Sequence, residues 1–317
     1  MGVQLEGRTV NVAWSPAELE RRPRAVAIGT FDGVHLGHRA VIRAAVDAGL
    51  TSTVVTFHPH PRTAFGNRVA LLSTLERRLE LLAELGVEDV LVVEFTPELA
   101  SVPPEDFARD YLAQVGAEIV VCGTGFRFGR ERAGNCDLLR TLGFDAREVP
   151  LVEGISSTKI RQLAEAGEVE GAARLLGRPL EIDGTVVSGD HRGGTLGFPT
   201  ANLSQAATGL IPADGVYAGF LVRPTLPERD PDHTLPAAIS IGTNPTFAGT
   251  QRRVEAYVLD RTDLELYGER VVFEFIERLR PTEKFDSVQS LVVQMRDDVE
   301  RCRARLSSTS DHDQERP

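Results

Sequence analysis

Residues 25–38 read AVAIGTFDGVHLGH. The apolar, β-prone run at 26–28 is typical of a strand that a parallel sheet buries on both faces. Glycines follow it and let the backbone approach a ligand closely. If a helix begins near Gly37, the imidazoles of His35 and His38 and several unpaired backbone N–H groups meet at its N-terminus, where phosphate oxygens bind well. The stretch therefore predicts a strand, a turn and a helix that together form a phosphate site.

Two interpretations of this turn are open. It is either a glycine-rich connection with two surface histidines or part of a phosphate-transferring active site. The buried strand before it and the tripeptide at 31–33 favour the active site, with His35 and His38 as its catalytic side chains. The residues expected to bind the nucleotide or its phosphates here are Gly29, Phe31, Asp32 and Gly33.

The composition is that of a soluble globular protein with room for two domains, with 317 residues, 42% of them hydrophobic and 26% charged. A formal net charge of −11 argues against a nucleic-acid partner, because phosphate backbones are bound mainly through excess Lys and Arg. The sequence has neither an export signal nor a run approaching the length of a membrane span, which predicts no membrane partner. It makes no prediction of oligomeric state.

The three cysteines are Cys122, Cys136 and Cys302. Their number is odd and no two of them form a CxxC pair, so the sequence predicts neither a disulfide framework nor a zinc site. A reducing cytoplasm is the expected compartment.

From residue 24 onward, β-like runs alternate with helical ones, which predicts an α/β domain with a parallel sheet. In the helical run 74–85, leucines recur at helical spacing with charged residues between them. In such sheets, ligands bind where strands end and helices begin. The expected strands are 25–31, 51–57, 87–95, 117–122 and 146–152, and the expected helices are 38–48, 74–85, 104–115 and 136–142.

Three other segments at the ends of these strands carry candidate ligands. The loop at 56–62 holds two imidazoles and a guanidinium between stiffening prolines, and the loop at 123–129 holds two aromatic rings that could flank a planar group. For both loops the alternative is that the aromatic rings pack on the core. The segment 155–161 places three hydroxyls and two cations at the start of a helix, which is more than capping requires and favours an oxyanion site.

The helical pattern largely ends near residue 178. We therefore predict a first domain at 1–178, a small β-barrel domain with a terminal amphipathic helix at 179–306, and a disordered tail at 307–317. The expected barrel strands are 181–188, 215–222, 236–242, 252–259 and 270–279.

Within the barrel region, Thr200 and Asn202 alternate on one face of an extended segment. Their uncharged oxygens suit Mg²⁺, which usually takes its other ligands from nucleotide phosphates and water. Glu255 is an acid in an otherwise apolar strand, where a carboxylate could act as general base toward a hydroxyl. The structural alternatives are that Thr200 and Asn202 cap a turn and that Glu255 faces solvent.

Taken in order, these motifs resemble the prokaryotic bifunctional riboflavin kinase/FAD synthetase family over residues 25 to 305. The motifs similar to the nucleotidyltransferase-like, Rossmann-like FMN adenylylation module are GTFDGVHLGH at 29–38, TFHPHP at 56–61, GFRFG at 125–129 and ISSTKIR at 155–161. Those similar to the riboflavin kinase module are LGFPTANL at 196–203, DGVYAG at 214–219, IGTNPTF at 241–247, VEAYVLD at 254–260, LYG at 266–268 and KFDS at 284–287.

The resemblance implies two sequential reactions with riboflavin, FMN and ATP as substrates and Mg²⁺ as cofactor. Riboflavin and ATP give FMN and ADP, and then FMN and ATP give FAD and pyrophosphate. It implies that Glu255 takes the proton of the ribityl 5′-hydroxyl and that Thr200 and Asn202 hold the metal. The nucleotide or phosphate ligands that it adds are Ser156, Ser157, Thr158, Arg161, Gly197 and Pro199, and the flavin ligands are His60, Phe126 and Phe128.

The chain departs from the family pattern at four places. Gly125 stands where the family usually has Asp or Asn, and His58 where it usually has an acid. In the kinase module, Gly194 replaces a frequent Arg and Thr282 a Glu. We therefore predict an active kinase joined to an adenylyltransferase that is either fully active or weakened.

Two alternatives of other kinds are open. One is a flavin-binding regulatory paralogue without turnover, which would have no need of a base such as Glu255. The other is a nucleotidyltransferase for a different acceptor, such as a sugar phosphate or pantetheine phosphate, which gives no reason for the attached kinase-like barrel.

Overall fold

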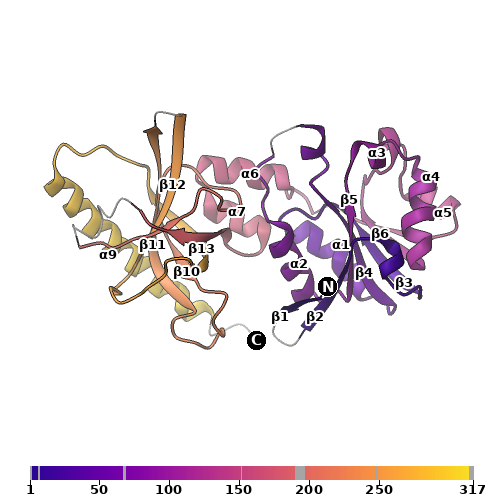
Figure 1. Ribbon diagram of the computed structural model, residues 1–317, viewed down its shortest axis with the longest axis horizontal. Helices are drawn as coiled ribbons and strands as arrows, with labels where there is room; N and C mark the ends of the chain where they lie inside the picture. Colours follow the sequence, from indigo (N-terminus) through magenta and orange to yellow (C-terminus); the bar gives the residue numbers. More distant parts are fainter. Residues whose placement is uncertain are drawn as a thin grey trace. The chain divides into compact units, whose positions relative to one another are not determined.

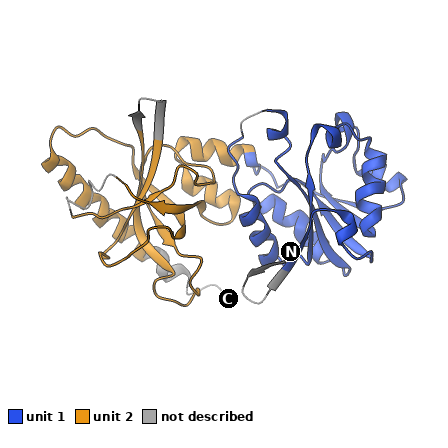
Figure 2. Cartoon of the chain, in the orientation of Figure 1, with its two compact units in different colours: residues 1–157 blue, residues 158–317 orange. Residues whose placement is uncertain are grey.

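The computed structural model describes residues 2–5, 8–66, 69–150, 152–189, 197–246 and 249–313. The chain divides into two compact units, Met1–Ser157 and Thr158–Pro317 (Figure 2). Three residues named in the sequence analysis lie outside the described residues: Gly194, Leu196 and Phe247.

The first unit is built on one sheet whose strand order is β1-β2-β5-β4-β3-β6-β7 (Figure 1). β1 pairs antiparallel with β2, and every other neighbouring pair is parallel. This confirms the predicted parallel sheet. The strands are β1 (Gly2–Leu5), β2 (Arg8–Ala13), β3 (Arg24–Ile28), β4 (Thr51–His58), β5 (Asp89–Glu94), β6 (Ala117–Gly123) and β7 (Asp145–Val149).

Helices cover both faces of this sheet because alternate residues of each strand point to opposite sides. Ala25 and Ala27 of β3 pack with the first group of helices, and Val26 and Ile28 pack with the second. The first group is α1 (Leu36–Val46) and α2 (Leu75–Glu84). The second group is α4 (Pro104–Phe107), a π-helical turn η3 (Ala108–Ala113) and α5 (Cys136–Thr141), with the short α3 (Pro97–Ala100) beside them.

β3 is the strand at which the order of the sheet reverses. β4 and β5 follow on one side of it, and β6 and β7 lie on the other side. In sheets of this kind, ligands bind outside the carboxyl ends of the strands at such a reversal. The turns that follow β3 and β6 are therefore placed side by side at the expected binding edge, as the sequence predicted.

The opposite end of β3 is fixed by a buried ionic cluster around Asp89. The guanidinium of Arg24, 1% exposed, hydrogen-bonds to this carboxylate, to the hydroxyl of Thr53 and to the carbonyl of Val115. Asn11 and Arg22 also donate to Asp89. Burial alone would raise the pKa of Asp89, but these hydrogen bonds outweigh it and hold that pKa below the ordinary value.

The second unit is a closed antiparallel barrel with the strand order β10-β11-β12-β9-β8-β13. The long helix α9 (Val288–Asp313) packs over part of its outer surface through Cys302 and Leu306, which confirms the predicted barrel with a terminal helix. The strands are β8 (Leu180–Val187), β9 (Ala201–Leu203), β10 (Gly215–Val222), β11 (Thr234–Thr246), β12 (Gly249–Val258) and β13 (Arg270–Arg280).

Two helices, α6 (Ser157–Ala166) and α7 (Val169–Leu176), precede the barrel. The sequence assigned them to the first domain, whereas almost all of their residues belong to the second unit. The amide of Ala213 donates to the carbonyl of Ala164, and Arg278 Nη1 donates to that of Ala166. These bonds join the two helices to the barrel, and the predicted boundary at residue 178 lies just after the end of α7.

Two sequence-based expectations differ from the structure. Cys122 and Cys136 form a disulfide between the end of β6 and the start of α5, whereas the sequence predicted no disulfide. Their separation of 14 residues carries no pairing signal, and only the return of the chain along the sheet brings them together. α9 also continues to Asp313, through residues expected in the tail, and the Ser307 hydroxyl donates to the Arg303 carbonyl one turn earlier.

Cys302 is the remaining cysteine, and it is buried. Its thiol donates to the carbonyl of Ala237 at 3.2 Å. Burial raises its pKa to about 11, so the thiol is neutral and inert in the core. Among the described residues, none of the helices combines the length and the apolar character that crossing a membrane requires.

We expect Asp89→Asn to destabilise the first unit by about 3–5 kcal/mol at pH 7, because it leaves the Arg24 charge buried without its partner. The native pKa of Asp89 is lowered, so its contribution is present above about pH 4 and is lost as pH falls through the native pKa. The measurement is urea unfolding followed by the fluorescence of Trp14, the single tryptophan.

Asp145→Asn is the matched control, since it removes a carboxylate whose ion pair with Arg147 is solvent-exposed, and such pairs contribute about 0–1 kcal/mol. Equal effects of the two substitutions, or an effect of Asp89→Asn that does not decrease as the pH falls below about 4, would contradict the assigned role of Asp89.

Candidate active sites

The turn after β3 has an unusual backbone. Phe31, Gly33 and Val34 have φ values of 49°, 81° and 40°. Residues other than glycine rarely adopt this region of the backbone. Gly29 leaves room for the ring of Phe31, since a Cβ there would lie 3.0 Å from Cζ. Strain of this kind concentrates at functional sites, so the turn is a candidate site on geometric grounds as well as by its motif.

The turn is held in place by Asp32, which is buried. Its Oδ1 accepts hydrogen bonds from the amides of Leu72 and Ser73 at 2.9 and 3.2 Å. The hydroxyl of Ser73 in turn accepts from the amide of Gly33 at 3.0 Å. The side chains of Phe31 and Asp32 therefore face the interior, and binding of a nucleotide by these residues stays a prediction that would rest on their backbone.

The two predicted histidines are in contact. His35 is the N-cap of α1, and its Nδ1 accepts from the amide of His38 at 3.2 Å. The two rings stack with centroids 3.5 Å apart and planes inclined by 18°, and the edge of Phe31 closes the other side of His38. Because His35 Nδ1 accepts from the amide of His38, its proton is assigned to Nε2.

The ring of His38 is held neutral. Burial first, and then the nearby His35 and Arg78, lower its pKa well below the ordinary value. Its Nδ1 is buried and has no hydrogen-bond partner among the residues that the structure describes. A buried, unsatisfied ring nitrogen at the N-terminus of a helix is typical of a group that finds its partner in a ligand.

The segment 155–161 forms the start of α6, as predicted. The hydroxyl of Ser157 donates to the backbone carbonyl of Asp32 at 3.2 Å, which ties the first residue of the helix to the turn. Ser156 is exposed beside it. Thr158 and Arg161 belong to the second unit, and their approach to phosphates bound at the histidines stays a prediction.

The predicted flavin ligands lie in different environments. Phe128 is 6% exposed and packs against Phe107 and Phe126 in the core. Its ring therefore packs on the core, which was the alternative to binding a ligand. Phe126 is half-buried and stacks on Phe128 with centroids 5.8 Å apart. His60 is half-buried, with Nδ1 accepting from the amide of Arg62.

Exposed aromatic side chains that the sequence analysis did not single out lie at the same edge of the sheet. Trp14 follows β2 and is 50% exposed, and its ring meets the edge of His58 at the end of β4. Phe65 is 60% exposed and meets Phe95, which follows β5. These residues are separate in sequence and are not periodic, so only the order of the strands brings them together.

Gly125, where the family usually has Asp or Asn, is exposed at φ 76°, and a Cβ there would meet nothing within 4 Å. Asn and Asp are the residues that, after glycine, best tolerate this left-handed conformation. The substitution therefore keeps the conformation of the loop and removes one polar side chain from it.

In the second unit, Thr200, Asn202 and Glu255 come together. β9 pairs with β12 so that Asn202 lies directly opposite Glu255. The Thr200 hydroxyl donates to Glu255 Oε2 at 3.4 Å, and Asn202 Nδ2 donates to the carbonyl and hydroxyl oxygens of Thr200 at 3.1 and 3.2 Å. Two neutral side-chain oxygens and a carboxylate thus share one small region of the barrel wall.

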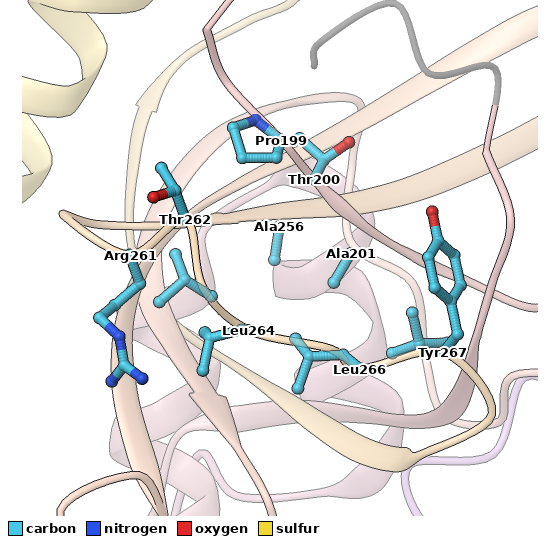
Figure 3. Close-up of a pocket in the computed structure, with 11 residues that line it drawn as sticks. Pro199, Thr200, Ala201, Ala256, Arg261, Thr262, Leu264, Leu266 and Tyr267 are labelled. Carbon is cyan, nitrogen blue, oxygen red and sulfur yellow. The ribbon is translucent and has the colours of Figure 1, made fainter.

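A pocket of about 200 Å³ adjoins this cluster (Figure 3). Pro199 and Thr200 lie on one side of it, and Leu264 and Leu266 lie on the other. Its remaining walls are largely apolar, and Tyr267, which is 63% exposed, stands at the rim. Gly197 is exposed at φ 87° just before this segment. The pocket is lined by apolar side chains together with the hydroxyl groups of Thr200 and Thr262.

The chemistry of this donor set fits Mg²⁺ better than a transition metal. Within the described ranges, no group of three or more His, Cys, Asp or Glu side chains is placed to hold a metal ion. Thr200 and Asn202 instead offer two neutral oxygens beside the Glu255 carboxylate, which suits a cation that keeps water and nucleotide phosphates in its coordination shell.

A parallel sheet with a histidine pair at the start of a helix, joined to a barrel that groups two neutral side-chain oxygens with a carboxylate beside a pocket, is the arrangement of a two-domain transferase. Residues 17–162 match the family model described as FAD synthetase, and residues 176–306 match the model described as riboflavin kinase. The chain belongs to the family of bifunctional riboflavin kinase/FMN adenylyltransferases.

Curated relatives with that description are similar over nearly their whole length. The protein from Listeria monocytogenes is 37% identical, with 91% of this chain and 94% of that protein covered. The protein from Escherichia coli K12 is 35% identical, with 85% and 88% covered. A crystal structure described as a macrolide-efflux protein from Streptococcus pneumoniae has a TM-score of 0.83 at 33% identity and covers 93% of this chain and 98% of that one. Its likeness to this chain concerns the fold.

We expect Gly37→Ala to lower kcat/KM for FMN adenylylation by up to about tenfold, since the ring of His35 must shift by a few tenths of an ångström and a displacement of about 1 Å can cost about 100-fold. A Cβ at Gly37 would lie 3.3 Å from Cε1 and Nδ1 of His35 and would press on that ring. The measurement is FAD formation from FMN and ATP, with riboflavin phosphorylation by the same preparation as internal control. Arg43→Ala, an exposed change on the same helix, should leave both rates unchanged, and equal losses in the two variants would exclude the ring-displacement explanation.

Proposed function

We propose that the second unit phosphorylates riboflavin at Glu255. The carboxylate takes the proton of the ribityl 5′-hydroxyl as that oxygen attacks the γ-phosphate of ATP, and ADP leaves. The observation that carries this assignment is the pairing of β9 with β12, which puts Asn202 opposite Glu255 and the Thr200 hydroxyl 3.4 Å from its Oε2. Positioning and charge neutralisation account for most of the rate in such transfers.

Thr200 and Asn202 would hold Mg²⁺ through their side-chain oxygens, as the sequence predicted. The bound metal neutralises charge on the nucleotide phosphates. Asn202 is oriented for this by its two contacts with Thr200. Gly189 supports the arrangement, because a Cβ there would lie within 2.5 Å of the Asn202 side chain.

The pocket beside Thr200 is the proposed adenine site of the kinase. Its largely apolar walls include Ala201, Ala256 and Leu266 and suit a planar base. Thr200, at one side of the pocket (Figure 3), contacts Glu255 and would direct the phosphates toward it. Arg261 at the rim is held by Asp232 and Asp263 at 2.6 and 2.7 Å, which fixes the loop that carries the pocket wall.

In the first unit, the phosphate of FMN attacks the α-phosphate of ATP, and pyrophosphate leaves. The FMN phosphate is already a competent nucleophile, so no general base is required. The ring N–H groups of His35 and His38 and the amides at the start of α1 are placed to donate to the charge that develops on the transferred phosphate. The hydroxyls of Ser156 and Ser157, with Thr158 and Arg161, would bind the departing pyrophosphate.

The exposed aromatic rings at the sheet edge are the proposed flavin platform of this unit. Trp14 and Phe65 offer their surfaces to solvent, and isoalloxazine is a large planar ring that stacks on aromatic side chains. Phe126 and His60 stay candidates for the same ring, whereas buried Phe128 would support Phe126 from behind. We place both reactions in the cytoplasm, the compartment expected from the sequence.

The test supplies riboflavin, ATP and Mg²⁺ and follows the flavins by chromatography. The wild-type protein should form FMN that then gives way to FAD. Glu255→Gln should slow FMN formation by about 10²- to 10⁴-fold, the usual range for loss of a general base, while riboflavin still binds and supplied FMN is still converted to FAD.

The other outcomes separate the alternatives. Wild-type protein that binds flavins without turnover would identify the regulatory paralogue. FMN that accumulates without FAD, even when FMN is supplied, would indicate a nucleotidyltransferase domain that is weakened or takes another acceptor. An unimpaired Glu255→Gln kinase would reject the proposed base.

Chelation of Mg²⁺ should stop both reactions. Thr200→Val should raise the Mg²⁺ concentration for half-maximal riboflavin phosphorylation at least about tenfold, since even outer-shell changes weaken metal sites by about 10- to 100-fold. The Mg²⁺ dependence of FMN adenylylation in the same variant is the control and should not change. A parallel shift of both dependences, or of neither, would show that Thr200 is not a ligand.

A further inference from the structure

Arg78 on α2 is a buried cation whose role is unassigned. The leucine pattern of this helix places it among the charged residues expected to face solvent, yet only 1% of it is exposed. Its Nη1 donates to the hydroxyl of Thr56 and to the carbonyl of Phe57, both at 3.2 Å. Its Nε is also buried and has no hydrogen-bond partner in the described part of the chain.

These contacts place the guanidinium at the carboxyl end of β4, beneath the turn that carries the active site. The Thr56 hydroxyl that accepts from Arg78 donates in turn to the carbonyl of Thr30 at 3.1 Å. The negative charges of Asp32, whose carboxylate holds the same turn, and of Glu76 raise the pKa of Arg78 and partly offset the effect of burial. One buried side chain thus connects the end of β4 with the turn after β3.

A contribution to folding stability does not by itself explain why an arginine is buried at this position. A buried charge costs several kcal/mol in desolvation, and an apolar side chain of similar volume often serves the fold equally well. Burial lowers the pKa of Arg78, but a guanidinium keeps its proton in proteins. The molecule therefore keeps a permanent positive charge at the edge of the sheet where phosphates are expected to bind.

We propose that Arg78 is a positioning residue for adenylyl transfer, whose buried guanidinium joins the end of β4, through Thr56, to the turn that leads into the histidine pair. The groups that act on His38 are the stacked ring of His35, from the turn before α1, and Arg78, from α2. Asp32 and Glu76 in turn raise the pKa of Arg78. This inference rests on the proposed role of the histidine pair in the first unit.

The neutral form matters because of the stack. A proton on His38 would place a cation 3.5 Å from the ring of His35 and close to Arg78. Repulsion between these groups would open the pair and weaken the cap that His35 provides for α1. Adenylylation should therefore decrease at acid pH, as His38 becomes protonated. The positive charge of Arg78 lowers the pKa of His38, so this decrease begins at a lower pH than it would without Arg78.

The test compares Arg78→Gln and Arg78→Lys with Arg77→Gln in the full-length protein. Gln removes the positive charge and keeps a hydrogen-bond donor. Lys keeps the positive charge and lacks the planar guanidinium with its several N–H donors. Arg77→Gln removes the same charge from the solvent side of α2, where Arg77 pairs with Glu80 and Glu84. The readouts are the pH dependence of kcat/KM for FMN adenylylation and the titration of His38 by NMR, assigned with His38→Gln.

We expect Arg78→Gln to lower kcat/KM by about tenfold or more and to move both the acid limb and the His38 titration to higher pH. Arg78→Lys should retain more activity, with a smaller shift, and Arg77→Gln should match the wild type. Riboflavin phosphorylation should be the same in every variant, and urea unfolding followed by Trp14 checks that the first unit is folded.

Two results would overturn the proposal. One is a uniform loss of activity in Arg78→Gln with the acid limb and the His38 titration unchanged, which would make Arg78 purely structural. The other needs no Arg78 variant: His38 of the wild-type protein titrating at the ordinary histidine pKa would show that the ring is not held neutral. If the time course shows no adenylylation at all while His38 still titrates below that value, the proposed role of the pair fails and the influence of Arg78 on His38 stands.

Discussion

The first unit depends on the two hydrogen bonds by which Asp32 holds the amides of Leu72 and Ser73. They fix a turn with three residues in the left-handed region of the backbone, a conformation that the turn would not keep by itself. From this turn, His35 caps α1, Ser157 reaches the Asp32 carbonyl, and Arg78 connects to it through Thr56. The chemistry of the site thus follows from one buried carboxylate.

In the second unit, the pairing of two strands positions the candidate site residues. β9 is only three residues long, but its register with β12 places Asn202 opposite Glu255. Side chains that lie opposite one another on an antiparallel pair are close. The register therefore brings the Asn202 side chain, a proposed Mg²⁺ ligand, next to the Glu255 carboxylate. A slip of one residue would turn these side chains to the other face of the wall.

The pattern of residues predicted most of the architecture. Alternating β-like and helical runs gave the parallel sheet, and the loss of helical periodicity marked the barrel, because both patterns are local consequences of burial. Helix α7 was not predicted, and the helical stretch after residue 100 contains a π-helical turn that periodicity does not reveal. The Cys122–Cys136 disulfide was also missed, since it depends on a contact between distant segments.

The sequence by itself determined the types of residue available for catalysis, because the histidines, the hydroxyl-rich segment and the Thr200, Asn202 and Glu255 set are recognisable from residue type and spacing. Only the tertiary structure decided how they are used. It buried Phe128 and Arg78 and brought exposed aromatic rings to one edge. Whether a charged or aromatic side chain is buried or meets a ligand depends on neighbours from other strands and helices, and local sequence does not specify those neighbours.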